Sequence, residues 1–152
     1  MKPTIYFATD HAGFELKNLL LQYVRDELQY EVVDCGPAVY DADDDYPDYI
    51  RIAAKKVSIR PTDRAIILGG SGQGEAMTAN RFPQVRATVF YGGSSEIITL
   101  SREHNDANIL SLGARFLTQQ EAENVIKKWL AVSFSGDERH VRRIKKIEHV
   151  NS

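Results

Sequence analysis

A chain of 152 residues is long enough to bury a hydrophobic core, and we expect one domain spanning residues 1–152. Its formal net charge of −2 argues against a general binder of nucleic acids or membrane surfaces. The single cysteine, Cys35, excludes an internal disulfide framework, and no apolar run approaches the roughly 20 residues of a membrane span. Since the N-terminal stretch also lacks a signal-peptide core, the sequence predicts a cytoplasmic protein.

Short apolar and β-branched runs alternate with longer amphipathic segments, a pattern typical of a parallel α/β sheet. The predicted strands are residues 4–9, 31–36, 64–70, 85–93 and 107–113. The predicted helices are residues 14–28, 46–59, 94–104 and 118–134, with one more beginning near Glu75 and an amphipathic tail at about 136–152. We therefore expect a three-layer α/β/α, Rossmann-like doubly wound five-stranded parallel sheet with a C-terminal helical extension.

Ligands of such folds bind beyond the carboxyl ends of the strands. Asp10 and His11 follow the first predicted strand, the loop 69–75 follows the third, and Arg115 follows the fifth. Asp10 could simply cap a helix and His11 could be a surface side chain. Two neighbouring titratable groups on the ligand-binding edge slightly favour a functional role.

The loop within ILGGSGQGEAMTANR, residues 67–81, is rich in glycine. It lacks the spacing and the distal acid of a dinucleotide fingerprint, and it lacks the Gly-Lys-Ser/Thr of a P-loop. What remains is a row of backbone N–H groups that could hold a developing oxyanion. Glu75 is then either a catalytic residue or an ordinary acid in the first turn of a helix, and the spacing leaves both open.

Two further segments carry polar clusters. SREHNDANIL places Arg102, His104, Asn105 and Asp106 before the fifth strand, at the opposite edge of the sheet, which favours a polar loop unless the segment serves a neighbouring subunit. The tail motif RHVRR places two arginines four residues apart on one helical face, a suitable fork for a phosphate dianion, although a solvated basic face would explain them equally simply.

The stretch YDADDDYPDY precedes the second predicted helix. Its acidic run lacks the glycine and terminal glutamate of an EF-hand, and we expect no metal site. Asp45 and Tyr46 could border a ligand site. Cys35, within an apolar strand, is expected to be a buried and inert thiol.

Together TDHAGF, GGSGQGEAMTANR, SREHNDANIL, GAR and RHVRR resemble the ribose-5-phosphate isomerase B family, which includes galactose-6-phosphate isomerase subunits. The resemblance runs from about Lys2 to Val150. It implies interconversion of aldose and ketose phosphates without a metal or organic cofactor. It also implies a homodimer with shared active sites, and leaves open whether dimers pair into a tetramer.

The resemblance implies that Glu75 is the base. One branch of the family uses a cysteine at the end of the third strand, where this chain has Gly69. Glu75 would transfer the C2 proton of ribose 5-phosphate to C1 through a cis-enediolate. The resemblance also implies that the enediolate is stabilised by residues of the glycine loop: Gly70, Ser71, Gly72 and Gly74. We expect a raised Glu75 pKa if apolar neighbours such as Met77 exclude water from it.

The remaining roles concern binding and ring opening. Asp10, together with His104 from a partner subunit, would open the furanose ring. Asn105 and Tyr46 would orient sugar hydroxyls. The phosphate would be bound by basic residues: Arg139, Arg143 and His11, assisted by Arg115 and His140. RHVRR favours ribose 5-phosphate, while the long acidic stretch leaves galactose or allose 6-phosphate open. A noncatalytic sugar-phosphate-binding protein of the same fold and a flavodoxin-like nucleotide binder are two competing hypotheses.

Overall fold

The computed structural model describes residues 1–152 and contains one five-stranded parallel sheet. The strands are β1 (Ile5–Ala8), β2 (Val32–Asp34), β3 (Arg64–Gly69), β4 (Ala87–Phe90) and β5 (Ile109–Gly113). Their order is β2-β1-β3-β5-β4, and all four pairings are parallel. The five predicted strands and their parallel arrangement are confirmed, although all five strands are shorter than predicted.

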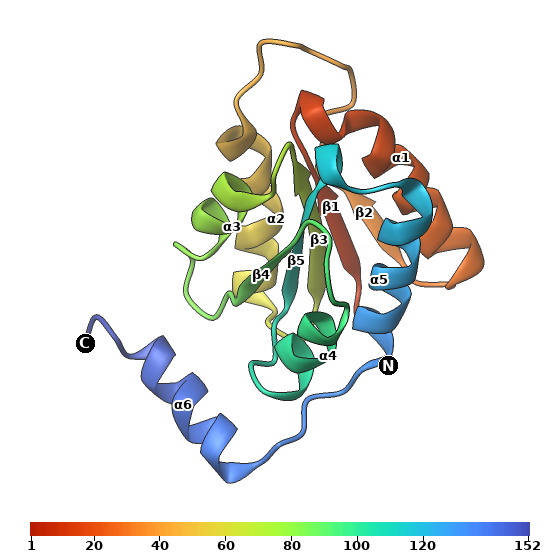
Figure 1. Cartoon of the computed structure of the whole chain (residues 1–152). Helices are drawn as coiled ribbons and strands as arrows, with labels where there is room; N and C mark the ends of the chain where they lie inside the picture. The colour runs from red at the N-terminus through yellow and green to blue at the C-terminus, as the bar shows by residue number, and fades with distance from the viewer.

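Helices cover both faces of the sheet (Figure 1). They are α1 (Phe14–Gln22), which continues as a π-helical turn (Tyr23–Glu27), α2 (Tyr46–Ile59), α3 (Gln73–Ala79), α4 (Glu96–Glu103), α5 (Gln119–Ala131) and α6 (Glu138–Glu148). One hydrophobic cluster joins the sheet to α1, α4 and α5, and a second joins it to α2 and α3. The three-layer α/β/α prediction is confirmed.

The central strand β3 shows why the layers form. Ile66 and Leu68 point into the first cluster, whereas Ala65 and Ile67 point into the second, and all four are fully buried. This alternation explains the uninterrupted apolar run in the sequence, because a strand covered on both faces has no solvent-exposed side. Burial of each large aliphatic side chain contributes about 1.5–3 kcal/mol.

Helix α5 begins at a capping box, as its sequence predicts. Thr118 Oγ1 accepts a hydrogen bond from the backbone N–H of Glu121 at 3.1 Å. Helix α6 stands apart from the sheet at the end of an extended segment (Figure 1). It contacts the rest of the chain near both of its ends, where His140 packs against His104 and where Glu148 forms an ion pair of 2.9 Å with Arg86. No helix of the structure has the length and apolar character needed to span a membrane.

The strand order creates a crevice at the carboxyl edge of the sheet. From β1 the chain moves outward to β2, whereas from β3 it moves to the other side, toward β4 and β5. Loops after β1 and β3 therefore diverge in opposite directions. In open α/β sheets, such a topological switch point is where ligands bind.

Candidate active site

The loop after β1 contributes Asp10 and His11 to the crevice. The side chain of Asp10 is buried and accepts a hydrogen bond of 2.9 Å from the backbone N–H of Ala12. Asp10 thus caps the short helical turn His11–Gly13. The predicted capping role is confirmed, and the cap also fixes the carboxyl group at the switch point.

The glycine loop after β3 is held in place by the strand beside it. Gly72 has φ +78°, a conformation that favours glycine, and its carbonyl accepts a hydrogen bond of 2.7 Å from Ser111 Oγ. The backbone N–H of Arg115 donates to the carbonyl of Gly70 at 3.1 Å. The loop is therefore fixed to the end of β5 before α3 begins.

Glu75 lies in the first turn of α3 and is only 4% exposed. Its carboxyl group folds back onto Gly69, where a β-carbon would collide with the carboxyl carbon and both oxygens. Gly69 therefore leaves the space that the Glu75 carboxyl occupies. A cysteine at position 69 would compete for that same space, so a cysteine base and a glutamate base exclude each other here.

Burial raises the pKa of Glu75, and the nearby Asp10 carboxylate raises it further, while backbone N–H groups of Glu75 and Gly72 act in the opposite direction. Desolvation thus raises this pKa as expected, but Met77, the neighbour named as an example, does not provide it. Met77 is 67% exposed and so covers little. The raised pKa makes the ionised carboxylate a stronger proton acceptor than an ordinary glutamate.

Two more predicted residues lie against the glycine loop. A β-carbon at Gly74 would collide with the Tyr46 hydroxyl, and one at Gly70 would lie 3.0 Å from a guanidinium nitrogen of Arg115. Tyr46 starts α2 and Arg115 follows β5, so three loops converge on this edge. The structure thus brings together Asp10, His11, Tyr46, Ser71, Glu75 and Arg115.

His11 has a partner that sequence reasoning missed. Its Nδ1 lies 2.7 Å from Asp44 Oδ1, and its backbone N–H donates to the same oxygen at 3.1 Å. The hydrogen bond to Asp44 is the main reason why the pKa of His11 is raised. The ligand atoms of Asp10, His11 and Asp44 lie within 4.8 Å of one another, a spacing that could hold a metal ion, but the His11–Asp44 hydrogen bond explains it without one.

The other predicted residues lie at the opposite end of the molecule. His104 follows α4, and its ring stacks on His140 of α6 with centroids 4.3 Å apart and an interplanar angle of 17°. Burial lowers the pKa of His140, and so do His104 and the neighbouring arginines. Arg139, Arg143 and His140 belong to α6, so this group lies far from Glu75 within a single chain.

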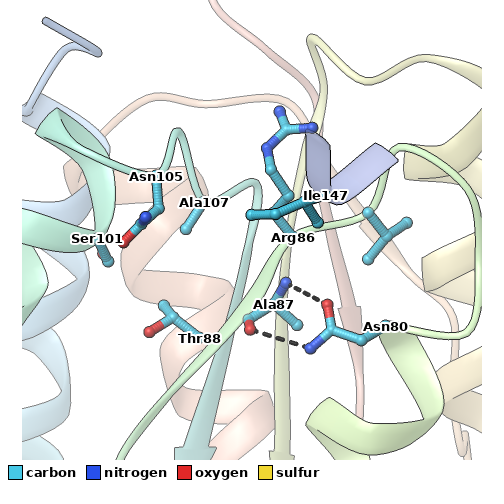
Figure 2. A pocket seen from close by; sticks show the side chains of 9 residues that line it. Asn80, Arg86, Ala87, Thr88, Ser101, Asn105, Ala107 and Ile147 are labelled. Carbon is cyan, nitrogen blue, oxygen red and sulfur yellow. Dashed lines mark hydrogen bonds between the residues drawn. The ribbon is translucent and has the colours of Figure 1, made fainter. Parts of the chain in front are cut away.

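Asn105 lines a separate cavity of about 330 Å³ beside the start of β4 (Figure 2). Ile147 of α6 and Arg86 also line this cavity, and the Asn80 side chain makes hydrogen bonds of 2.8 and 3.2 Å with the backbone of Ala87. Arg102, which the sequence pattern singled out beside Asn105, is structural: its guanidinium donates to backbone carbonyls and to a carboxylate of the same segment.

The fold and the site define a class: a doubly wound α/β protein with a buried carboxyl group on a glycine loop at the topological switch point. The chain matches the model of the Ribose/Galactose Isomerase family over residues 5–147, and it belongs to that family. This confirms the resemblance inferred from the motifs.

Proteins similar to this chain in sequence and in structure are ribose-5-phosphate isomerases of type B. Ribose-5-phosphate isomerase B of Mycobacterium tuberculosis (strain H37Rv) is 38% identical over 140 residues, which cover 92% of this chain and 85% of that protein. The crystal structure of ribose-5-phosphate isomerase B from Mycoplasma genitalium with bound ribulose-5-phosphate matches with a TM-score of 0.92 at 37% identity, covering 99% of this chain and 97% of that one. The type B enzyme of Trypanosoma cruzi matches with a TM-score of 0.91 at 34% identity, with coverages of 99% and 97%.

Proposed function

We propose that this protein is an aldose–ketose isomerase that interconverts ribose 5-phosphate and ribulose 5-phosphate, with Glu75 as the base and without a cofactor. The observation that carries the proposal is the buried Glu75 carboxyl folded onto Gly69 beside a loop of backbone N–H groups, in a member of this family. The relatives from Mycobacterium tuberculosis and Mycoplasma genitalium support ribose 5-phosphate as the substrate.

The reaction begins with opening of the furanose ring. One group removes the proton of the C1 hydroxyl, another protonates the ring oxygen, and C1 becomes an aldehyde. Asp10 is fixed at the switch point by its bond to the Ala12 N–H. We assign these two tasks to Asp10 and to His104 of a second subunit.

Isomerisation follows at C1 and C2. The Glu75 carboxylate removes the C2 proton, the electron pair forms the C1–C2 double bond, and negative charge develops on O1. Glu75 then returns the proton to C1 while the proton of the C2 hydroxyl moves to O1, which yields the ketone. Tyr46 and Asn105 orient the sugar hydroxyls in this scheme.

The glycine loop stabilises the enediolate. Backbone N–H groups of Gly72 and Glu75 lie against the Glu75 carboxyl, in a loop fixed by hydrogen bonds to the end of β5, and we assign the Ser71 hydroxyl and the other N–H groups of residues 70–74 to the same task. Donors held in place before the reaction need no reorganisation when charge appears, and loss of one such donor typically costs about 3 kcal/mol of transition-state stabilisation.

Phosphate binding requires a second subunit in this proposal. Arg139, Arg143 and His140 lie on α6, which extends away from the body of its own chain (Figure 1). A partner in a homodimer would bring these groups, and the tail at about 136–152, to the edge that carries His11 and Arg115. Paired guanidinium groups bind a phosphate dianion through parallel charge-assisted hydrogen bonds. We place this dimer in the cytoplasm, where an isolated thiol such as Cys35 stays reduced.

The proposal is tested by assaying Glu75→Gln against ribose 5-phosphate and a panel of pentose and hexose phosphates. The variant should lose turnover about a hundredfold or more, while it still binds ribose 5-phosphate. The matched control is Glu96→Gln, which removes an exposed glutamate in the first turn of α4 and should keep wild-type turnover. A wild-type protein that binds the sugar phosphate without turning it over would be a noncatalytic binding protein. A clear preference for a hexose phosphate would change the substrate but keep the mechanism.

A further inference from the structure

This inference rests on the proposed function and concerns Asp44, a residue of the acidic stretch that the proposed mechanism does not use. The Asp44 side chain is only 3% exposed, and its two hydrogen bonds both come from His11, one from the ring and one from the backbone. The other carboxylate oxygen, Oδ2, is buried and has no hydrogen-bond partner. The carboxylate therefore depends on His11 for both of its hydrogen bonds.

The contact with Asp44 determines which nitrogen of the His11 ring carries a proton. A carboxylate can only accept a hydrogen bond, so Nδ1 must carry a proton. In the neutral ring, Nε2 would then present a lone pair, which repels a phosphate dianion. In the protonated ring, Nε2 becomes a charged donor. Because a nearby negative charge favours the protonated ring, Asp44 selects the form that can bind phosphate.

Other groups around the ring also act on its charge. Asp10 raises the pKa of His11 as well, whereas burial and Arg115 lower it. The rings of Tyr40 and His11 form a T-shaped pair with a centroid distance of 6.3 Å. His11, Glu15, Tyr40 and Arg115 border a cavity of about 440 Å³. In this cavity His11 and Arg115 are the basic side chains, so an anion is the ligand that its chemistry suits best.

We propose that Asp44 is a positioning residue, which orients His11 and keeps it protonated so that Nε2–H donates to the phosphate of the substrate. Asp44 acts only through His11 and does not touch the sugar. The acidic stretch of the sequence thus supports binding of an anion, although its own charge has the wrong sign for direct contact.

The test compares Asp44→Asn with Asp43→Asn, which removes an exposed carboxylate of the same loop. Nitrogen-detected NMR measures the His11 tautomer and pKa in each protein, with and without inorganic phosphate. Asp44→Asn should lower the His11 pKa, because it removes the hydrogen bond that raises this pKa most. It should weaken phosphate binding and raise the KM for ribose 5-phosphate about tenfold at pH values above the His11 pKa. The effect should shrink as the pH falls, since the ring then protonates in both proteins.

A double-mutant cycle separates positioning from loss of structure. In a His11→Gln background, Asp44→Asn should change KM less than about twofold, and kcat should change little in the single variant. The inference is overturned if Asp44→Asn leaves the His11 pKa and the phosphate affinity unchanged, or if Asp43→Asn has the same effect. Wild-type protein that binds phosphate through His11 but shows no turnover would refute the isomerase proposal alone, because the NMR measurements do not depend on turnover.

Discussion

Gly69→Ala should lower catalytic activity strongly while changing the stability of the protein little. A β-carbon at this position collides with three atoms of the Glu75 carboxyl group. Gly69 ends β3, and its φ lies outside the left-handed region, so the backbone tolerates alanine. The atoms that must move belong to the flexible end of a side chain, and we expect a loss of stability of about 1 kcal/mol or less.

The effect on catalysis should be far larger. To escape the collision, the carboxyl group must move by about 1 Å or more, and a displacement of that size can lower the rate about a hundredfold. The assay is kcat for ribose 5-phosphate, measured together with thermal unfolding. We expect a loss of about a hundredfold in kcat with a nearly unchanged midpoint.

The control is the same substitution in a Glu75→Gln background. If Gly69 acts by making room for the base, Gly69→Ala should cause little further loss once the base is gone. Wild-type kcat in Gly69→Ala, or equal losses in both backgrounds, would refute the reasoning, since the carboxyl position would then not matter.

Three other predictions concern the site and the buried Lys17–Asp34 ion pair. If the active sites are shared, mixing Glu75→Gln with Arg143→Ala subunits should restore about a quarter of wild-type activity, because half of the dimers are mixed and each has one intact site; no recovery after exchange would contradict sharing. Since Asp10 raises the Glu75 pKa, Asp10→Asn should move the acidic limb of the kcat/KM profile to lower pH, and an unmoved limb would count against this coupling. Lys17→Met removes a fully buried ammonium group that forms an ion pair of 2.8 Å with Asp34, whose side chain remains 40% exposed to water. We expect the free energy of unfolding to fall by about 1–3 kcal/mol in denaturant titrations. An unchanged unfolding midpoint would refute a stabilising role of the pair.

Periodicity and capping signals predicted the elements well. The apolar run of β3 and the capping box at Thr118 each report on contacts within a few residues, and such local rules carry over to the folded chain. Element ends were less accurate. The predicted helix 118–134 stops at Ala131, because β-branched Val132 takes up extended backbone.

The gathering of loops at the carboxyl edge was also predictable, because parallel strands end on the same side. The specific contacts were not. Asp44 reaches His11 across 33 residues of sequence, and no spacing rule predicts that hydrogen bond. The fit of Glu75 onto Gly69 depends on a side-chain rotamer, which a pattern of residue types does not encode. The stacking of His104 on His140 likewise depends on where α6 lies relative to α4, which a local pattern of residues does not encode.

The central claim is that the Glu75 carboxylate removes the C2 proton of the sugar. The most direct measurement is NMR of the C2 hydrogen of ribose 5-phosphate in deuterated water, with wild type and Glu75→Gln at concentrations that saturate binding. Wild-type protein should exchange this hydrogen with solvent or convert it to product, and the bound variant should leave it in place. Exchange at the wild-type rate in Glu75→Gln would show that another group is the base.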